Sequence, residues 1–163
     1  MTVPPEQRKL PQARMYWRSA QWGFEALLQE KLSGYGYRFY VIGILSALRA
    51  VQHSLNAHDR NLSPKHREVI SAWWEKTADD ADIPDLRFIR TARNQVLKAG
   101  AFNSYAGHTE TGIGEGANYR VTKTEYELWY YDEDDHRQDL GAALGSAIDW
   151  CDLELSEIER QIG

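Results

Sequence analysis

Cysteine is almost missing from the chain: Cys151 is the only one among 163 residues. A single thiol excludes an internal disulfide and a zinc site built from several cysteines. Long apolar runs are missing too, because the longest, FYVIGILSAL, has about half the ~20 residues that a bilayer-spanning helix needs. The N-terminal segment MTVPPEQRKLPQ lacks the apolar stretch of a signal peptide. We therefore expect a cytoplasmic protein with no membrane partner.

An excess of positive charge is also lacking. The 19 Lys and Arg residues against 24 Asp and Glu residues give a formal net charge of -5. This balance argues against a general nucleic-acid coat and against binding to an anionic membrane surface. A net value does not exclude a local basic patch. The length suits one domain, and the 6 Trp and 9 Tyr residues predict a dense core that shares some aromatic surface with a partner.

Apolar residues recur at helical spacing through most of the chain. Three prolines before residue 12 predict a flexible N-terminal arm over residues 1–11, and residues 12–163 form the single domain. Ser63 followed by Pro64 is a typical helix start, and Asp82 or Asp85 can cap the helix after it. The pattern predicts five helical segments, over about residues 12–32, 37–56, 64–76, 85–105 and 135–162.

Residues 106–134 interrupt the helical pattern. The glycine-rich residues 106–118 predict a flexible loop, and the alternating aromatic and β-branched residues after them predict a strand or hairpin. GIGEG at 112–116 lacks the preceding strand and the following helix of a phosphate loop. We interpret the acids at 132–135 as capping the last helix rather than binding a cation. The fold class predicted is all-α: an up-and-down bundle of four to five helices with a short β-hairpin or irregular insertion before the last helix.

The segment RTARNQVLKAG, residues 90–100, gathers basic and amide side chains on the fourth helix. At about 100° per residue, Arg87, Asn94 and Lys98 share one side, opposite an apolar side, and Arg90 flanks them. Arg93 falls between apolar residues, so its guanidinium either snorkels or points into a partly buried pocket. A planar cationic fork beside an amide is suited to phosphate oxygens. A solvated basic face is the alternative interpretation.

The segment TARNQVLKAGAF resembles the signature of the HEPN superfamily, in which Arg, a polar residue (often Asn) and three more residues are followed by His. Arg93 and Asn94 match the first two positions. The helix YRFYVIGILSALRAVQHSL is similar to the helix that precedes the signature in many of these proteins. The order of elements agrees as well, so the resemblance covers about residues 12–160.

The resemblance implies a HEPN-like bundle and a homodimer in which two Arg-Asn-His sets meet in one cleft, as in a metal-independent ribonuclease or an inactive relative. There, Arg stabilises the phosphorane and His exchanges protons. This chain has Lys98 at the His position, and an ordinary lysine pKa of about 10.4 keeps it protonated at neutral pH. A tyrosine of some toxin members is Gly100 here. We therefore expect a degenerate site of Arg93, Asn94 and Lys98.

Around that site we expect Arg90 and Arg87 to act as phosphate ligands, with neither a metal nor a cofactor. The function predicted is RNA or nucleotide phosphate binding, or regulation, in a bacterial or phage defence or toxin-antitoxin system. One alternative is an active ribonuclease in which Lys98 or a recruited histidine carries protons. Another is a helical domain that binds a partner protein and no nucleotide.

Further candidate residues have mainly structural interpretations. We expect His53 to be partly buried, the Trp pair at 73–74 to pack in the core, and Cys151 to be inert in an apolar seam. We expect His58 and His66 to be solvated, His108 to lie in the glycine-rich loop, and His136 to stand at a helix start.

Overall fold

The computed structural model describes residues 9–32, 36–77, 83–99, 104–132 and 134–163, with only the backbone described for 97–99. Over these residues the fold is mostly helical, with five α-helices and a three-stranded antiparallel sheet before the last helix. The helical fold expected from the sequence, with a β insertion before the last helix, is therefore confirmed, but the insertion is a three-stranded sheet rather than a short hairpin, so the fold is mostly α rather than all-α. The helices are α1 (Pro11–Glu30), α2 (Gly36–Ala57), α3 (Pro64–Lys76), α4 (Pro84–Ala99) and α5 (Leu140–Ile162). The strands are β1 (Ser104–Ile113), β2 (Arg120–Tyr131) and β3 (Arg137–Asp139).

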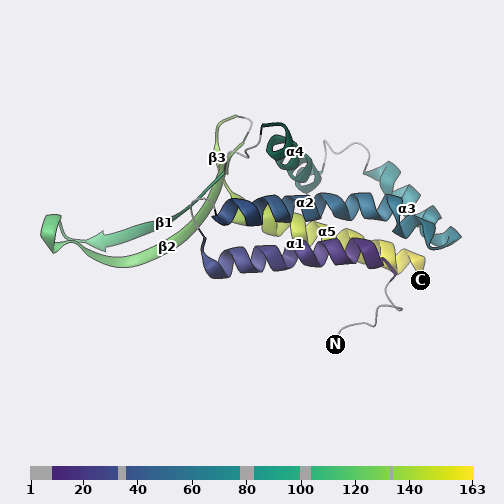
Figure 1. The fold of residues 1–163 in the computed structure, drawn as a ribbon, viewed down its shortest axis with the longest axis horizontal. Coiled ribbons are helices and arrows are strands. Elements are labelled where there is room, and N and C mark those ends of the chain that lie inside the picture. The colour runs from purple at the N-terminus through teal and green to yellow at the C-terminus, as the bar shows by residue number, and fades with distance from the viewer. Residues whose placement is uncertain (1–8, 33–35, 78–82, 100–103, 133) are drawn as a thin grey trace.

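The long helices α1, α2 and α5 run along the long axis of the molecule, and β1 and β2 project from one end of them (Figure 1). The helix α1 runs antiparallel to α2, while α3 lies at the end of the bundle opposite the hairpin (Figure 1). Among the described residues, no helix is both long and apolar enough to cross a membrane.

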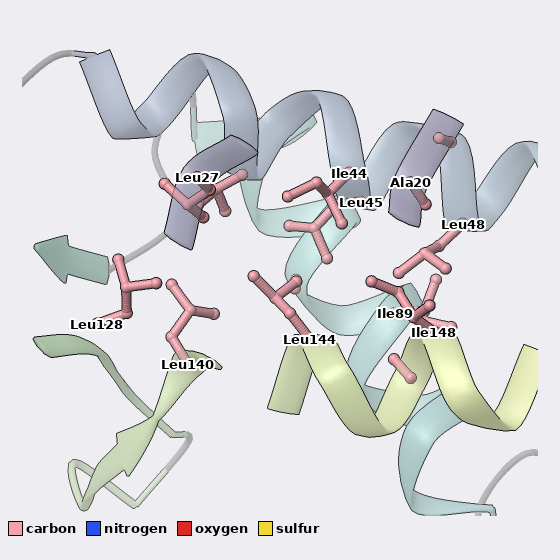
Figure 2. Close-up of a cluster of buried hydrophobic side chains, with 14 of the residues drawn as sticks. Ala20, Leu27, Ile44, Leu45, Leu48, Ile89, Leu128, Leu140, Leu144 and Ile148 are labelled. Atoms are coloured by element: carbon pink, nitrogen blue, oxygen red, sulfur yellow. The ribbon is translucent and has the colours of Figure 1, made fainter. Parts of the chain in front are cut away.

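Helix α2 is buried on more than one side, as its apolar stripe predicts. Leu45 and Leu48 lie in one buried cluster with Ile89 of α4 and with Leu144 and Ile148 of α5 (Figure 2). Each fully buried leucine contributes about 1.5–3 kcal/mol relative to an exposed one. This cluster is therefore what holds α4 against the bundle.

A second buried cluster joins the other ends of the helices to α3. It contains Val51, Leu55, Ile70, Trp73 and Leu155, together with Leu10, which has no exposed surface. The expected flexible arm over residues 1–11 is thus wrong at its end, because Leu10 is buried and Pro11 opens α1. Residues 1–8 lie outside the described part of the chain.

The start of α3 matches the sequence prediction. The Ser63 side chain accepts a hydrogen bond from the His66 backbone N–H, and Pro64 is the first helical residue. The expectation of a solvated His66 is wrong, because its ring contacts Ser63 Oγ at 2.7 Å and the Lys9 carbonyl at 2.9 Å. Of the two caps expected for α4, Asp85 lies inside its first turn and Asp82 lies outside the described residues.

The glycine-rich loop predicted over residues 106–118 is also wrong, because most of it is strand β1. Helix α4 ends at Ala99 rather than near residue 105, and β1 pairs with β2 from Ser104↔Tyr130 to Ile113↔Arg120. Gly112 permits this pairing, since a Cβ there would lie 2.4 Å from the Arg120 carbonyl oxygen. Glycines in a sequence suggest a flexible loop, but in β1 they allow the backbones of β1 and β2 to approach closely.

The acids at 132–135 do not cap the last helix. The Asp132 carboxylate accepts from the backbone N–H groups of Asp134 and His136, which closes a turn between β2 and β3. Helix α5 begins at Leu140, and Asp139 caps it by accepting from the Ala142 N–H at 2.8 Å. The predicted start near residue 135, with His136 at the helix start, is therefore a few residues too early.

Two positions on α5 test the buried cluster with the same substitution. Leu144 has no exposed surface, whereas Leu153 is 69% exposed. We expect Leu144→Ala to lower the free energy of unfolding by about 2–5 kcal/mol, because it leaves a cavity. Urea unfolding followed by circular dichroism measures this, and Leu153→Ala is expected to change it by about 0.5 kcal/mol or less. Equal losses in the two variants would show that the cluster does not hold the bundle.

Candidate functional site

Helix α4 contacts the bundle through an apolar stripe, and Arg93 lies at the C-terminal end of this stripe. Leu86, Ile89 and Ala92 are all buried. Because residues four apart share a helix face, Arg93 lies one turn beyond Ile89 on the side that faces the bundle. The side chain of Arg93 is partly buried.

Helix α2 places three polar side chains near this position. Arg49 Nη1 donates a hydrogen bond to Gln52 Oε1, and Gln52 is only 2% exposed. The buried Gln52 Nε2 has no hydrogen-bond partner among the described residues. His53 is exposed, so the expectation of a partly buried structural histidine is wrong.

The pKa of His53 responds to charges on both helices. Although His53 is exposed, desolvation of its ring by the surrounding protein lowers its pKa, and the positive charges of Arg49 and then Arg93 lower it further. A like charge disfavours the protonated imidazole, so the charges of Arg49 and Arg93 both act on the ring. The candidate site is this cluster of Arg49, Gln52, His53, Arg93 and Asn94, which we call the α2–α4 polar cluster.

The Arg-Asn pair expected from the sequence is brought together in the structure. Arg93 Nη1 donates to Asn94 Oδ1 at 3.4 Å, while Asn94 itself is exposed. Such a long contact orients the guanidinium without occupying all of its donors. The Lys98 side chain lies outside what the structure describes, so its part in the site stays a prediction.

The two outer arginines predicted as phosphate ligands have different positions relative to the α2–α4 polar cluster. Arg90 is partly buried, near Asn94 on the next turn of α4. Arg87 is six residues before Arg93, roughly 120° around the helix. It lines a different hollow, so the structure does not place Arg87 in the α2–α4 polar cluster.

That hollow is a groove of about 370 Å³ between α4 and the end of β2. Its aromatic wall includes Phe88 and Tyr130, whose ring centroids lie 5.5 Å apart. Burial raises the pKa of Tyr130, and the charge of Asp132 adds to this. Thr91 and Gln95 of α4 also line the groove, as do the acidic residues Asp132 and Asp134. No local sequence pattern predicts this groove, because its two sides come from segments about 40 residues apart.

A larger groove of about 700 Å³ lies between α1, the sheet and the start of α5. Arg137 stacks over the Trp129 ring at 4.5 Å and pairs with the Glu127 carboxylate at 3.0 Å. Since its cation already has an acidic partner, Arg137 offers little positive charge to an anion in this groove.

The remaining candidates have structural roles. Burial raises the pKa of Cys151 to about 12, and only 2% of the residue is exposed, which fits an inert packing residue. Trp73 is 8% exposed and donates to Glu154 at 2.6 Å, as expected for a core residue. His108 lies in β1 with its ring centroid 5.3 Å from that of Tyr126. Within the described ranges, no three His, Cys, Asp or Glu side chains gather as a metal site.

Comparison with known proteins adds no relative: no family model, no curated protein and no solved structure matches the chain. The resemblance to HEPN proteins therefore stays a prediction, and the candidate site stands on its own geometry.

The titration of His53 tests this geometry. We expect its pKa to lie below the ordinary value of about 6.5 and to rise in Arg93→Gln, because one nearby positive charge is lost. NMR spectra of the imidazole ring across a pH series measure both values. Arg38→Gln is the control, since residue 38 lies roughly 22 Å along the same helix. A His53 pKa that responds equally to the two substitutions would refute the cluster.

Proposed function

We propose that the protein binds the phosphate groups of single-stranded RNA, or of a nucleotide, at the α2–α4 polar cluster. The observation that carries the proposal is the placement of Arg93 beside Asn94 on α4, with Arg49 held by the buried Gln52 on α2. The lowered pKa of His53, caused first by desolvation and then by Arg49 and Arg93, agrees with it. Two guanidinium groups near one imidazole raise the local positive potential in a chain whose net charge is -5. Such a concentration of like charge is typical of a site that receives an anion.

The chemistry of the cluster suits a phosphate in particular. The planar guanidinium fork of Arg93 matches two phosphate oxygens, and Asn94 holds the group from one side. The buried Gln52 orients Arg49 in the same way from α2. Rigid arginines lose less side-chain entropy on binding than freely rotating surface arginines would.

The groove on the other side of α4 favours RNA over inorganic phosphate. Phe88 and Tyr130 offer aromatic faces, and Thr91 and Gln95 offer hydrogen-bonding groups at their edge. Single-stranded RNA is recognised by base stacking on aromatic side chains together with contacts to its phosphates. An RNA strand that runs over the outer surface of α4, from the α2–α4 polar cluster to this groove, would pass Arg87.

RNA cleavage is a second candidate function, and the state of His53 favours it. An exposed imidazole with a lowered pKa is largely neutral at pH 7 and can accept the proton of a ribose 2′-hydroxyl. The 2′-oxygen would then bond to phosphorus, the bond from phosphorus to the 5′-oxygen would break, and Arg93 would stabilise the phosphorane. A protonated Lys98 would give its proton to the leaving 5′-oxygen, which leaves a 2′,3′-cyclic phosphate and a 5′-hydroxyl.

The resemblance to HEPN proteins extends the proposal to a homodimer in a defence or toxin-antitoxin role. A helical domain that binds only a partner protein is the rival without a nucleotide ligand. RNA binding separates these interpretations.

Binding is measured by fluorescence anisotropy with a labelled single-stranded RNA of twelve nucleotides. We expect Arg93→Ala to weaken binding about 10- to 100-fold, because it removes charge-assisted hydrogen bonds of about 1.5–3 kcal/mol. Affinity is also expected to fall as salt is raised. The matched control is Arg120→Ala in the hairpin, which keeps the same net charge as Arg93→Ala. Equal binding by both variants, or no binding by the unmodified protein, would reject the proposal. A helical domain that binds only a partner protein would then be the remaining interpretation.

Cleavage is tested on the same RNA in the presence of EDTA, with products separated on a denaturing gel. For a binding protein we expect the RNA to stay intact. Cleavage that Arg93→Ala and His53→Ala each reduce at least tenfold, with 2′,3′-cyclic phosphate ends, would establish the second candidate. Cleavage that persists unchanged in His53→Ala would exclude His53 as the proton acceptor.

A further inference from the structure

Strand β1 forms an open edge of the sheet. The strand order is β1-β2-β3, and within the described ranges the central residues of β1 pair with β2 alone. Its 10 residues exceed the usual strand length of about 5–6. Proteins usually block long edges with Lys, Pro or a bulge, because the free N–H and C=O groups recruit another strand. The sequence SYAGHTETGI contains no Lys and no Pro, and the register shift lies near its end, between Thr111 and Gly112.

The outer part of the hairpin is also poorly supported by the rest of the molecule. The third strand pairs only with residues 129–131 of β2, and beyond that point the hairpin is a two-stranded ribbon that projects from the bundle (Figure 1). Residues 120–125 are all exposed, including Val121 at 47%, and Ile113 is 74% exposed. A two-stranded ribbon is marginally stable in water, so a further strand would stabilise it.

We propose that a second copy of this chain supplies that strand, and that two β1 strands pair antiparallel about a two-fold axis through Thr109. The result is one continuous sheet across the dimer, with the two bundles at its opposite ends. This proposal does not depend on the proposed function, because it rests on the sheet edge alone.

Backbone geometry restricts the register. Along an edge strand, alternate residues point their N–H and C=O groups outward, so only residues of the same outward set can face each other. A two-fold pairing of identical strands must therefore place a residue on the axis. The candidates in the middle of β1 are Gly107, His108, Thr109 and Glu110.

Charge complementarity selects Thr109 among these four. With Glu110 on the axis, two carboxylates would stand directly opposite each other, which is destabilising. With His108 on the axis, two imidazoles face each other. With Gly107 on the axis, the carboxylate of Glu110 faces the partner's Ser104. In neither register does Glu110 face the partner's His108. With Thr109 on the axis, Glu110 faces the partner's His108, and the same contact recurs on the other side.

The same register also pairs apolar surface. Residues 105 and 113 both lie four positions from Thr109, so Ile113 faces the partner's Tyr105. These two side chains are 74% and 43% exposed. An aromatic residue opposite an aliphatic one contributes about 0.2–1 kcal/mol across a strand pair, and the two-fold axis provides the contact twice.

The axis is tested by a cysteine crosslink. In the proposed dimer the two Cα atoms at position 109 lie about 4.5–5.5 Å apart, which is within the range of a disulfide. We expect Thr109→Cys to form a covalent dimer under mild oxidation. Cys151 does not compete, because it is 2% exposed. Thr111→Cys is the matched control: Thr111 is also exposed, but the two copies would lie roughly 13 Å apart along the strands.

Charge substitutions test the pairing of His108 with Glu110. Analytical ultracentrifugation of the unmodified protein is expected to show a dimer, and Glu110→Lys is expected to raise its dissociation constant at least tenfold. The double substitution His108→Glu with Glu110→Lys places opposite charges across from each other, and we expect it to restore the dimer. Circular dichroism verifies that each variant is folded.

Three outcomes would overturn the proposal. The first is a monomer at about 100 μM, which would leave the edge unpaired. The second is crosslinking of Thr111→Cys as efficient as that of Thr109→Cys. The third is a dimer whose dissociation constant is unchanged by Glu110→Lys. That result would place the interface elsewhere, for example at a face that includes the α2–α4 polar cluster.

Discussion

The burial of Ile89 in the same cluster as Leu45 and Leu48 is the contact on which the candidate site depends. A helix repeats its faces every three to four residues, so the residues one turn beyond a buried contact come to its border. On α4 that residue is Arg93, and on α2 the residue one turn beyond Leu45 is Arg49. The apolar contact therefore places both arginines at the border of the buried faces of α2 and α4, although neither belongs to the core.

The positive charges of Arg49 and Arg93 add to desolvation in lowering the pKa of His53, because like charges disfavour the protonated imidazole. Two other arginines lie beside acids: Arg14 contacts Glu159 at 2.7 Å and also Asp152, and Arg137 contacts Glu127 at 3.0 Å. A phosphate bound beside Arg93 and Asn94 would place negative charge next to this guanidinium in the same way.

Local patterns predicted much of the helical structure. The bounds of α1 and α2 were predicted to within about two residues, because their apolar periodicity is regular, and Ser63 with Pro64 identified the start of α3. Two regions with ambiguous local signals were predicted wrongly. The glycines of β1 suggested a loop because close approach to β2 is invisible in one segment, and the acids before α5 suggested a cap although Asp139 fills that role.

The candidate site was predictable only in part, for the same reason. The pairing of Arg93 with Asn94 follows from adjacency on one helix. The contributions of Arg49 and His53 come from another helix, and those of Tyr130 from a strand, so no spacing rule could assign them. The open edge of β1 likewise depends on knowing the strand order.

The most direct test of phosphate binding at the α2–α4 polar cluster is an NMR titration of labelled protein with single-stranded RNA. It follows the Nε–H of Arg93 and the ring of His53 together with those of other arginines and histidines. We expect both signals to shift and to saturate with one dissociation constant, while Arg120 in the hairpin stays unchanged. Saturable binding that leaves Arg93 and His53 unshifted would contradict the proposed site.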